Sequence, residues 1–178
     1  MSYGLISIDE MDVGVLISVV SAGIIILYFL VHGVLNIKLS LYKIEKVSNV
    51  SNRKLIQEII WFTNDILNGK GIAHFPTYKI SHYRHKRYLG VYANSGITIY
   101  IKNHQDIREL ISTVLHEVGH HIQYEANRKE YIRYEEYSRI HSHDKNPLEI
   151  DCYQFADKWL SSCILHLHKK NIIRMVVI

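Results

Sequence analysis

Residues 113–125 read Thr-Val-Leu-His-Glu-Val-Gly-His-His-Ile-Gln-Tyr-Glu, and their apolar side chains recur at the interval of an α-helix. We expect a helix over about 106–125. His116 and His120 are four residues apart and therefore share one face of that helix. The surrounding apolar side chains give it a packing surface: Val114, Leu115, Val118 and Ile122. Gly119 lowers helix propensity by about 1 kcal/mol relative to Ala, which predicts that another element approaches this face closely.

The five residues from His116 to His120 match the pattern H-E-x-x-H. Two imidazoles one turn apart can bind a single Zn²⁺, and Glu117 beside them can reach the water that completes the coordination sphere. The pattern predicts that His116 and His120 are metal ligands and that Glu117 is the catalytic base. The longer metzincin pattern is excluded, because its third histidine would fall at position 126, which is Ala126.

A catalytic zinc site uses a third protein ligand, and the segment 146–160 supplies candidates. Pro147 suits the first turn of a helix, and the apolar residues that follow it recur at helical intervals. Glu149 and Asp151 lie near the start of this second helix. The helix dipole also favours negative charge there, so either acid has a purely structural explanation as well. We expect Glu149 to be the third ligand, with Asp151 in reserve.

These two segments together resemble the gluzincin group of zinc metallopeptidases. The run from Glu149 to Ala156, Glu-Ile-Asp-Cys-Tyr-Gln-Phe-Ala, is similar to the pattern E-x-E-A-[DN]-x-[FY]-A. That pattern belongs to the HtpX and CAAX-prenyl-endopeptidase group and to small phage and mobile-element peptidases that cleave repressors. The resemblance implies that Glu149 is the ligand. Cys152 and Tyr153 depart from the pattern, so Tyr153 or another acid such as Asp157 would have to orient the histidines.

Upstream, two strands are predicted at 88–92 and 97–101, around a turn at Asn94-Ser95-Gly96 that tolerates positive φ. Residues 78–81 add a possible third strand, and Ser51 caps a helix that runs to about Asn68. The predicted class is α+β. The resemblance implies a small zincin-like domain, in which a short sheet packs on the H-E-x-x-H helix and its edge strand pairs with the substrate backbone. The alternative is a purely structural hairpin.

The N-terminal segment 13–37 is apolar, with no charged residue between Asp12 and Lys38. As a helix rising about 1.5 Å per residue, it is long enough to cross a hydrocarbon core of about 30 Å. We expect a single-pass transmembrane helix; a signal peptide or a buried core helix are the alternatives. The basic residues near the span all follow it: Lys38, Lys43, Lys46, Arg53 and Lys54. The positive-inside rule then places the N-terminus outside and the catalytic domain on the cytoplasmic side.

This span divides the chain into five expected parts. They are a short tail (1–12), the transmembrane helix (13–37), a basic connector (38–50), a zinc metallopeptidase-like domain (51–170) and an apolar tail (171–178). The domain is long enough for one hydrophobic core but not for two. Its composition is rich in Ile, Lys, Asn and Tyr, which suggests an AT-rich bacterial or viral genome. In a virus, the membrane could be that of the virion.

The net charge, two further histidines and the two cysteines concern partners, metal ligands and the cellular compartment. The formal net charge is +4, and the cluster 82–87 is basic, yet we expect a solvated loop or a contact with anionic lipid there and no nucleic acid. His141 and His143 lie between the two helices and form an alternative or second set of ligands. Cys152 and Cys163 fall on one helix, too far apart for a disulfide, which suits a reducing compartment.

The sequence therefore predicts a membrane-anchored, zinc-dependent endopeptidase that hydrolyses protein or peptide substrates with a zinc-activated water and Glu117 as general base. The alternative is an inactive or structural zincin-like membrane protein that acts as an interaction module, for example in a virion or envelope. An oxyanion stabiliser is also expected. Five side chains are eligible for that role: Tyr124, Tyr134, Tyr137, Tyr153 and His121. The substrate and the oligomeric state stay open.

Overall fold

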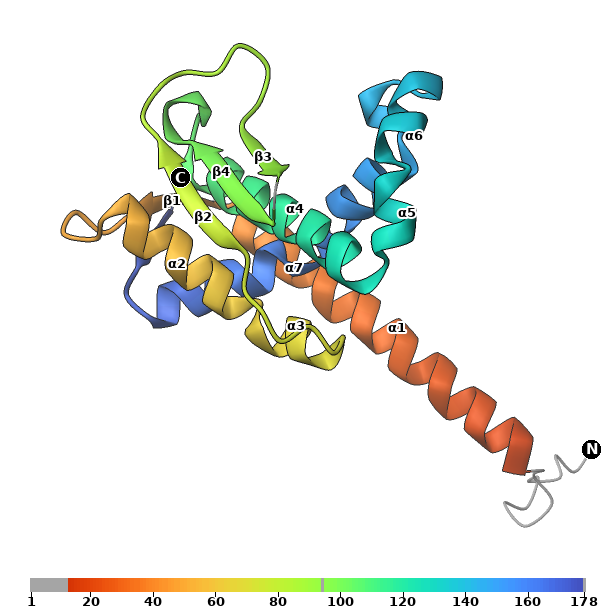
Figure 1. Cartoon of the computed structure of the whole chain (residues 1–178). Helices are drawn as coiled ribbons and strands as arrows, with labels where there is room; N and C mark the ends of the chain where they lie inside the picture. Colours follow the sequence, from red (N-terminus) through yellow and green to blue (C-terminus); the bar gives the residue numbers. More distant parts are fainter. Residues whose placement is uncertain (1–12, 94, 178) are drawn as a thin grey trace, which may run out of the picture. The chain divides into compact units, whose positions relative to one another are not determined.

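The computed structural model of the chain describes residues 13–93 and 95–177 (Figure 1). The predicted tail 1–12 and Asn94 of the predicted turn lie outside the described residues. The chain divides into two units, Met1–Leu41 and Tyr42–Ile178. The second unit combines helices with two small sheets, which confirms the predicted α+β class.

The described part of the first unit contains one helix, α1 (Val13–Ser40), which is 28 residues long. Its described apolar side chains are mostly exposed, for example Ile24 at 64% and Leu27 at 62%. Among the residues described in full, no helix is both long enough and apolar enough to cross a membrane. The transmembrane helix predicted at 13–37 is therefore not confirmed and stays a prediction.

A three-stranded sheet with the order β2-β4-β3 lies in the second unit. Strands β3 (Gly90–Ala93) and β4 (Gly96–Tyr100) form the predicted hairpin, and Ser95 between them has the expected positive φ, 60°. Strand β2 (Thr77–Ser81) confirms the third predicted strand and pairs with β4 in parallel. Among the described strands β3 has a single neighbour, so it forms an edge of this sheet.

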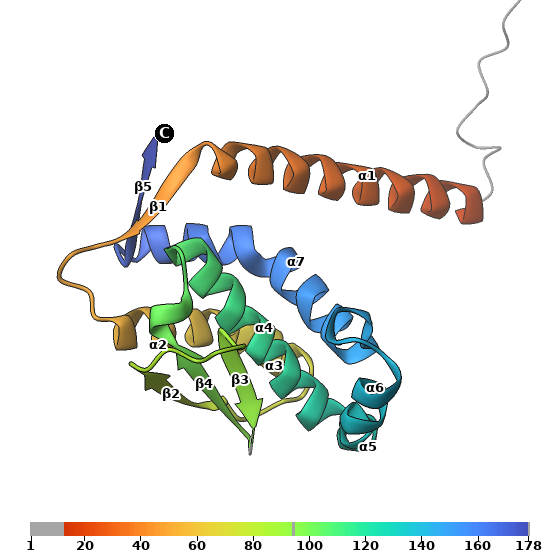
Figure 2. The same ribbon diagram turned by 90° about the horizontal axis from the view of Figure 1, so that it is seen from above.

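Helix α4 (Ile107–Ala126) carries the H-E-x-x-H residues and confirms the helix predicted over about 106–125; its N-cap is Asp106. Figure 2 shows it between the three-stranded sheet and α7 (Pro147–Lys169). Apolar side chains from the three elements fill the space between them and are completely or almost completely buried: Ile97, Ile99, Leu110, Ile111, Val114, Leu115, Val118, Ile164 and Leu167. This core fixes α4 against both neighbours.

The close approach predicted at Gly119 is made by α7. A Cβ atom at Gly119 would lie only 3.2 Å from the Cα of Cys152 and 3.1 Å from its Sγ. The two helices cross here with no room for a side chain on α4. The glycine thus brings the start of α7, where Glu149 lies, next to His120.

Between α4 and α7 the chain forms short helices. These are α5 (Arg128–Ile132), α6 (Tyr134–Ile140) and the 3-10 turn η3 (His143–Lys145). Before the sheet, Ser51 caps α2 (Asn52–Phe62) as predicted, but the helix ends at Phe62 and a separate α3 (Asn64–Gly69) follows. Thr63 separates them, and its buried hydroxyl donates to the carbonyl of Ile60 at 2.7 Å. A further 3-10 turn, η2 (Ile101–Asn103), follows β4.

The boundaries of the second unit differ from those predicted. The segment predicted as a connector contains β1 (Tyr42–Lys46), and the segment predicted as an apolar tail contains β5 (Ile173–Val177). The two strands pair antiparallel, with Ile44 opposite Met175. The salt bridge from Arg174 Nη2 to Glu45 Oε2, at 2.6 Å, adds to the pairing. Strands β1 and β5 therefore both belong to the second unit, which begins at Tyr42, inside the predicted connector.

Candidate metal centre

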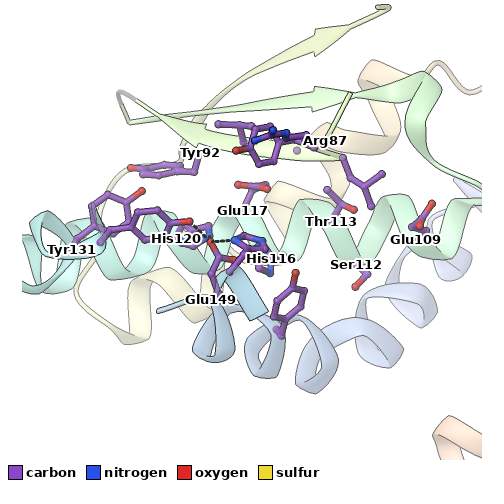
Figure 3. Close-up of a pocket in the computed structure, with 17 residues that line it drawn as sticks. Arg87, Tyr92, Glu109, Ser112, Thr113, His116, Glu117, His120, Tyr131 and Glu149 are labelled. Atoms are coloured by element: carbon purple, nitrogen blue, oxygen red, sulfur yellow. Dashed lines mark hydrogen bonds and ion pairs between the residues drawn. The ribbon is translucent and has the colours of Figure 1, made fainter. Parts of the chain in front are cut away.

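Three side chains from two helices converge at the centre of the second unit (Figure 3). His116 and His120 project from one face of α4, and Glu149 projects from the first turn of α7. His116 Nε2 lies 3.0 Å from Glu149 Oε2, and His120 Nε2 lies 3.5 Å from Glu149 Oε1. The potential ligand atoms all lie within 4.8 Å of one another. This buried group of two imidazoles and a carboxylate could hold a metal ion.

The start of α7 is built so that Glu149 faces α4. Asn146 is completely buried and caps the helix, and its Oδ1 accepts from the backbone N–H of Leu148 at 3.0 Å. Pro147 occupies the first turn, where its missing N–H costs nothing. Gln123 of α4 then donates from Nε2 to the carbonyl of Leu148 at 2.8 Å. These contacts tie the first turn of α7 directly to the helix that carries the histidines.

Gln123 also sets the orientation of His120, a role that the sequence did not reveal. Because its Nε2 is committed to Leu148, its Oε1 faces His120 and accepts from the ring Nδ1–H at 3.1 Å. A proton on Nδ1 leaves the Nε2 lone pair available to a metal. The only signal in the sequence was the position of Gln123, three residues after His120 on the same helix face.

The structure also locates the reserve ligand Asp151 and the two residues expected to orient the histidines, Tyr153 and Asp157. Asp151 and Asp157 are exposed on α7, and neither lines the cleft described below. The predicted reserve ligand Asp151 is therefore not part of the group of three. The ring of Tyr153 packs against His116, with centroids 4.5 Å apart. His116 Nδ1 is buried and has no hydrogen-bond partner among the described residues.

One histidine of the interhelical loop reaches the centre. His143 Nδ1 lies 3.4 Å from Glu149 Oε1, although the His143 side chain is 57% exposed. His141 is exposed and does not line the cleft. His143 is not within the group of three potential ligands. It approaches the carboxylate from the solvent side.

The charge of Glu149 is favoured by its contacts. Burial alone would raise the pKa of this carboxyl, but the imidazoles of His116 and His120 and the hydroxyl of Tyr134 outweigh it. Together they hold the pKa of Glu149 well below its ordinary value. Tyr134 donates its hydroxyl proton to Glu149 Oε1. A carboxylate that stays ionised is the form that binds a cation.

The pKa of Glu117 is shifted in the opposite direction to that of Glu149. Its side chain is buried, and burial raises the pKa to about 7; the negative charge of Glu149 acts in the same direction. His120 and the backbone N–H of Tyr92 partly oppose this shift. A carboxyl with a pKa near neutrality can both accept and release a proton. Glu117 is therefore suited to proton transfer and Glu149 to binding a cation.

A cleft of about 490 Å³ opens over these residues. One wall is the continuous run from Arg87 to Tyr92, which includes part of the edge strand β3. The floor is one face of α4, and tyrosines from α5, α6 and α7 line the rest: Tyr131, Tyr134 and Tyr153. His116, Glu117, His120 and Glu149 are all among the lining residues. The potential ligands and the potential base thus share one solvent-accessible space.

Only two of the five residues considered as oxyanion stabilisers lie in the cleft. Tyr134 and Tyr153 line the cleft, whereas Tyr124, Tyr137 and His121 do not. His121 is buried in a structural network. Its Nε2–H donates to the carbonyl of His74 at 2.8 Å, and its Nδ1 accepts from the Tyr92 hydroxyl at 3.2 Å.

The donor set fits a divalent metal that binds both nitrogen and oxygen ligands. Comparison with known proteins adds nothing to this geometry: no family model matches the chain, and neither a curated protein nor a solved structure is significantly similar to it.

Proposed function

We propose that the chain is a membrane-anchored zinc endopeptidase of the gluzincin type. The observation that carries this proposal is the convergence of His116, His120 and Glu149 beside a buried Glu117 in an open cleft. Two histidines and one glutamate form a three-ligand set that is typical of catalytic rather than structural zinc sites. The two helices that supply them are those on which the sequence resembles the gluzincins.

Each residue of the centre has a distinct task in the proposed reaction. When bound, the zinc ion would supply Lewis acidity that makes water a nucleophile at neutral pH. Glu117 accepts the proton of the attacking water on its carboxylate and then passes it to the nitrogen of the leaving amine. Gln123 keeps His120 in the metal-binding tautomer. Because the Tyr134 hydroxyl is committed to Glu149, we assign stabilisation of the oxyanion to Tyr153.

The edge strand β3 is the proposed binding site for the peptide backbone. It borders the cleft along Gly90, Val91 and Tyr92, and its outer edge has no partner among the described strands. An extended peptide could add to this edge by main-chain hydrogen bonds. Its scissile bond would then pass above Glu117.

We extend the proposal to the membrane. The segment between Asp12 and Lys38 has no charged residue, and the described apolar side chains of α1 between Ile17 and Val34 are exposed. A helix that is apolar around its whole circumference is typical of a membrane span. The basic residues that follow would keep the second unit on the cytoplasmic side.

Metal analysis and a peptidase assay on the full-length protein in detergent test the proposal. We expect one zinc ion per chain and hydrolysis of unstructured peptides that stops when a chelator removes the metal and resumes when zinc is restored. A folded protein that binds no metal would contradict the whole proposal. Stoichiometric zinc without hydrolysis of any peptide would instead favour the alternative, a zincin-like interaction module.

Gly90 provides a test of how precisely Glu117 must be placed. A Cβ atom at position 90 would lie 2.8 Å from Glu117 Oε1 and 2.9 Å from both Glu117 Cγ and Thr113 Cγ2. Gly90→Ala should therefore displace Glu117 and lower kcat by about 10- to 100-fold, because small misplacements of reacting groups are costly. Zinc content should not change, since no ligand is touched. Gly69→Ala is the control, because nothing lies within 4 Å of its Cβ position. Equal rates for the two variants would contradict the predicted role of this contact.

A further inference from the structure

A basic segment adjoins the cleft. The segment that precedes β3 contains Arg84, Lys86 and Arg87, whose side chains are all exposed. Arg87 lines the cleft, and Figure 3 shows it on the sheet side, across from the helix that carries Glu117. We call Arg84, Lys86 and Arg87 the basic rim. The proposed peptidase reaction does not use these residues.

The backbone of the rim is held in one conformation by two side chains. Asn103 of η2 accepts from the N–H of His85 at 3.2 Å and donates to the carbonyls of His85 and Tyr88 at 2.7 and 2.8 Å. His85 Nδ1 accepts from the N–H groups of Arg87 and Tyr88 at 3.2 and 3.0 Å. The His85 ring also stacks on Tyr88, with centroids 4.9 Å apart. These hydrogen bonds therefore constrain the backbone of this loop.

No ion pair among the described residues balances the positive charge of the rim. None of the ion pairs between described residues involves Arg84, Lys86 or Arg87. Glu109, in the first turn of α4, also lines the cleft. Its Oε2 accepts from the backbone N–H of Gln105 at 2.6 Å, and the helix dipole stabilises its charge there. Glu109 is thus already engaged, and Arg87 is left as a cleft-lining cation without an ionic partner among the described residues.

The chain itself limits how far the rim lies from the proposed reaction. Gly90 is in contact range of Glu117, and Arg87 comes three residues earlier. Three residues span at most roughly 10 Å, even when fully extended. A peptide paired with β3 advances about 3.3 Å per residue. The backbone of Arg87 can therefore lie beside a peptide residue no more than about three positions from the residue that lies over Gly90.

We propose that the basic rim selects substrates with an acidic side chain within about three residues of the scissile bond, on the Arg87 side of the cleft. This inference rests on the proposed peptidase function. The rim would pair with an aspartate or glutamate of the bound peptide. An exposed pair of this kind changes affinity modestly, and partial burial in the cleft strengthens it.

A randomised peptide library tests the inference on the full-length protein in detergent. Sequencing of the products should show Asp and Glu enriched within three positions on one side of the cleaved bond. For a matched pair of peptides with Asp or Asn at that position, the acidic peptide should have a kcat/KM about three- to tenfold higher at low salt. The difference should shrink at high ionic strength.

Variants of the rim sharpen the test. Arg87→Gln should reduce the preference, and Arg87→Glu should reverse it toward Lys or Arg at the same position. Lys70→Gln is the matched control, because Lys70 is exposed and does not line the cleft. Cleavage without an acidic preference, or a preference that Arg87→Glu leaves unchanged, would overturn the inference but not the peptidase function.

A binding measurement separates the two proposals. The Glu117→Gln protein, which should not turn substrate over, is titrated with fluorescent peptide pools that are rich in Asp and Glu or in Asn and Gln. Tighter binding of the acidic pool supports the rim even if no peptide is hydrolysed, and equal binding overturns it. An effect of Arg87→Gln that appears only in phosphatidylserine vesicles would assign the rim to lipid headgroups, and this also overturns the inference.

Discussion

Glu117→Gln should lower the rate of peptide hydrolysis by about 10²- to 10⁴-fold while zinc stays bound. Glutamine has nearly the shape of the buried glutamate, and its amide oxygen can still accept from the backbone N–H of Tyr92. It cannot, however, take a proton from water at neutral pH. His116, His120 and Glu149 are unchanged, so the metal site should keep its ligands. Single-turnover assays on a matched pair of metal-loaded proteins measure this effect.

Two controls accompany this variant. Zinc content and the tryptophan fluorescence of the folded unit should equal those of the wild type, because the substitution adds no volume and removes no ligand. If Glu117→Gln leaves hydrolysis intact, Glu117 is not the base. If the wild type hydrolyses nothing and both proteins support every biological role equally, the interaction-module alternative is the correct one.

Glu149→Ala should weaken zinc binding by at least about 10- to 100-fold, since loss of a ligand costs no less than loss of an outer partner. Glu149 is nearly fully buried and lies within reach of both imidazoles, at 3.0 and 3.5 Å. Its removal leaves two histidines, which is fewer than any catalytic zinc site requires. Competition with a chromogenic chelator measures the change in affinity.

Asp151→Ala is the matched control for Glu149→Ala. Asp151 lies two residues further along α7 and is exposed, so its removal should leave zinc affinity unchanged. The opposite pattern would transfer the third ligand to Asp151. Retention of zinc in both variants and its loss in His143→Ala would transfer the ligand to the loop, where His143 already approaches Glu149 at 3.4 Å.

The local elements of the fold were predictable from the sequence. Helical periodicity indicated α4, Pro147 indicated the start of α7, and the turn before Gly96 indicated the hairpin. The spacing of His116 and His120 and the placement of Glu149 at a helix start were enough to predict the group that the structure brings together. Each of these signals is contained in a few consecutive residues.

What the sequence did not reveal depends on contacts between distant segments. The pairing of β1 with β5 joins strands of five residues that are far apart in the chain, and neither strand has a strong pattern alone. The role of Gln123 depends on the carbonyl of Leu148 in another helix. The break at Thr63 coincides with a side-chain hydrogen bond to the carbonyl of Ile60, of a kind that competes with helical structure. Periodicity carries no information on such contacts.

The pairing of β1 with β5 has a consequence during synthesis of the protein on the ribosome. A ribosome that adds about 5–20 residues per second emits β1 many seconds before β5 exists. During this interval β1 presents an unpaired edge to every other nascent chain nearby. Its sequence, Tyr-Lys-Ile-Glu-Lys, carries three charges in five residues, which discourages such pairing. The charges of β1 therefore discourage its pairing with other chains until β5 has been synthesised.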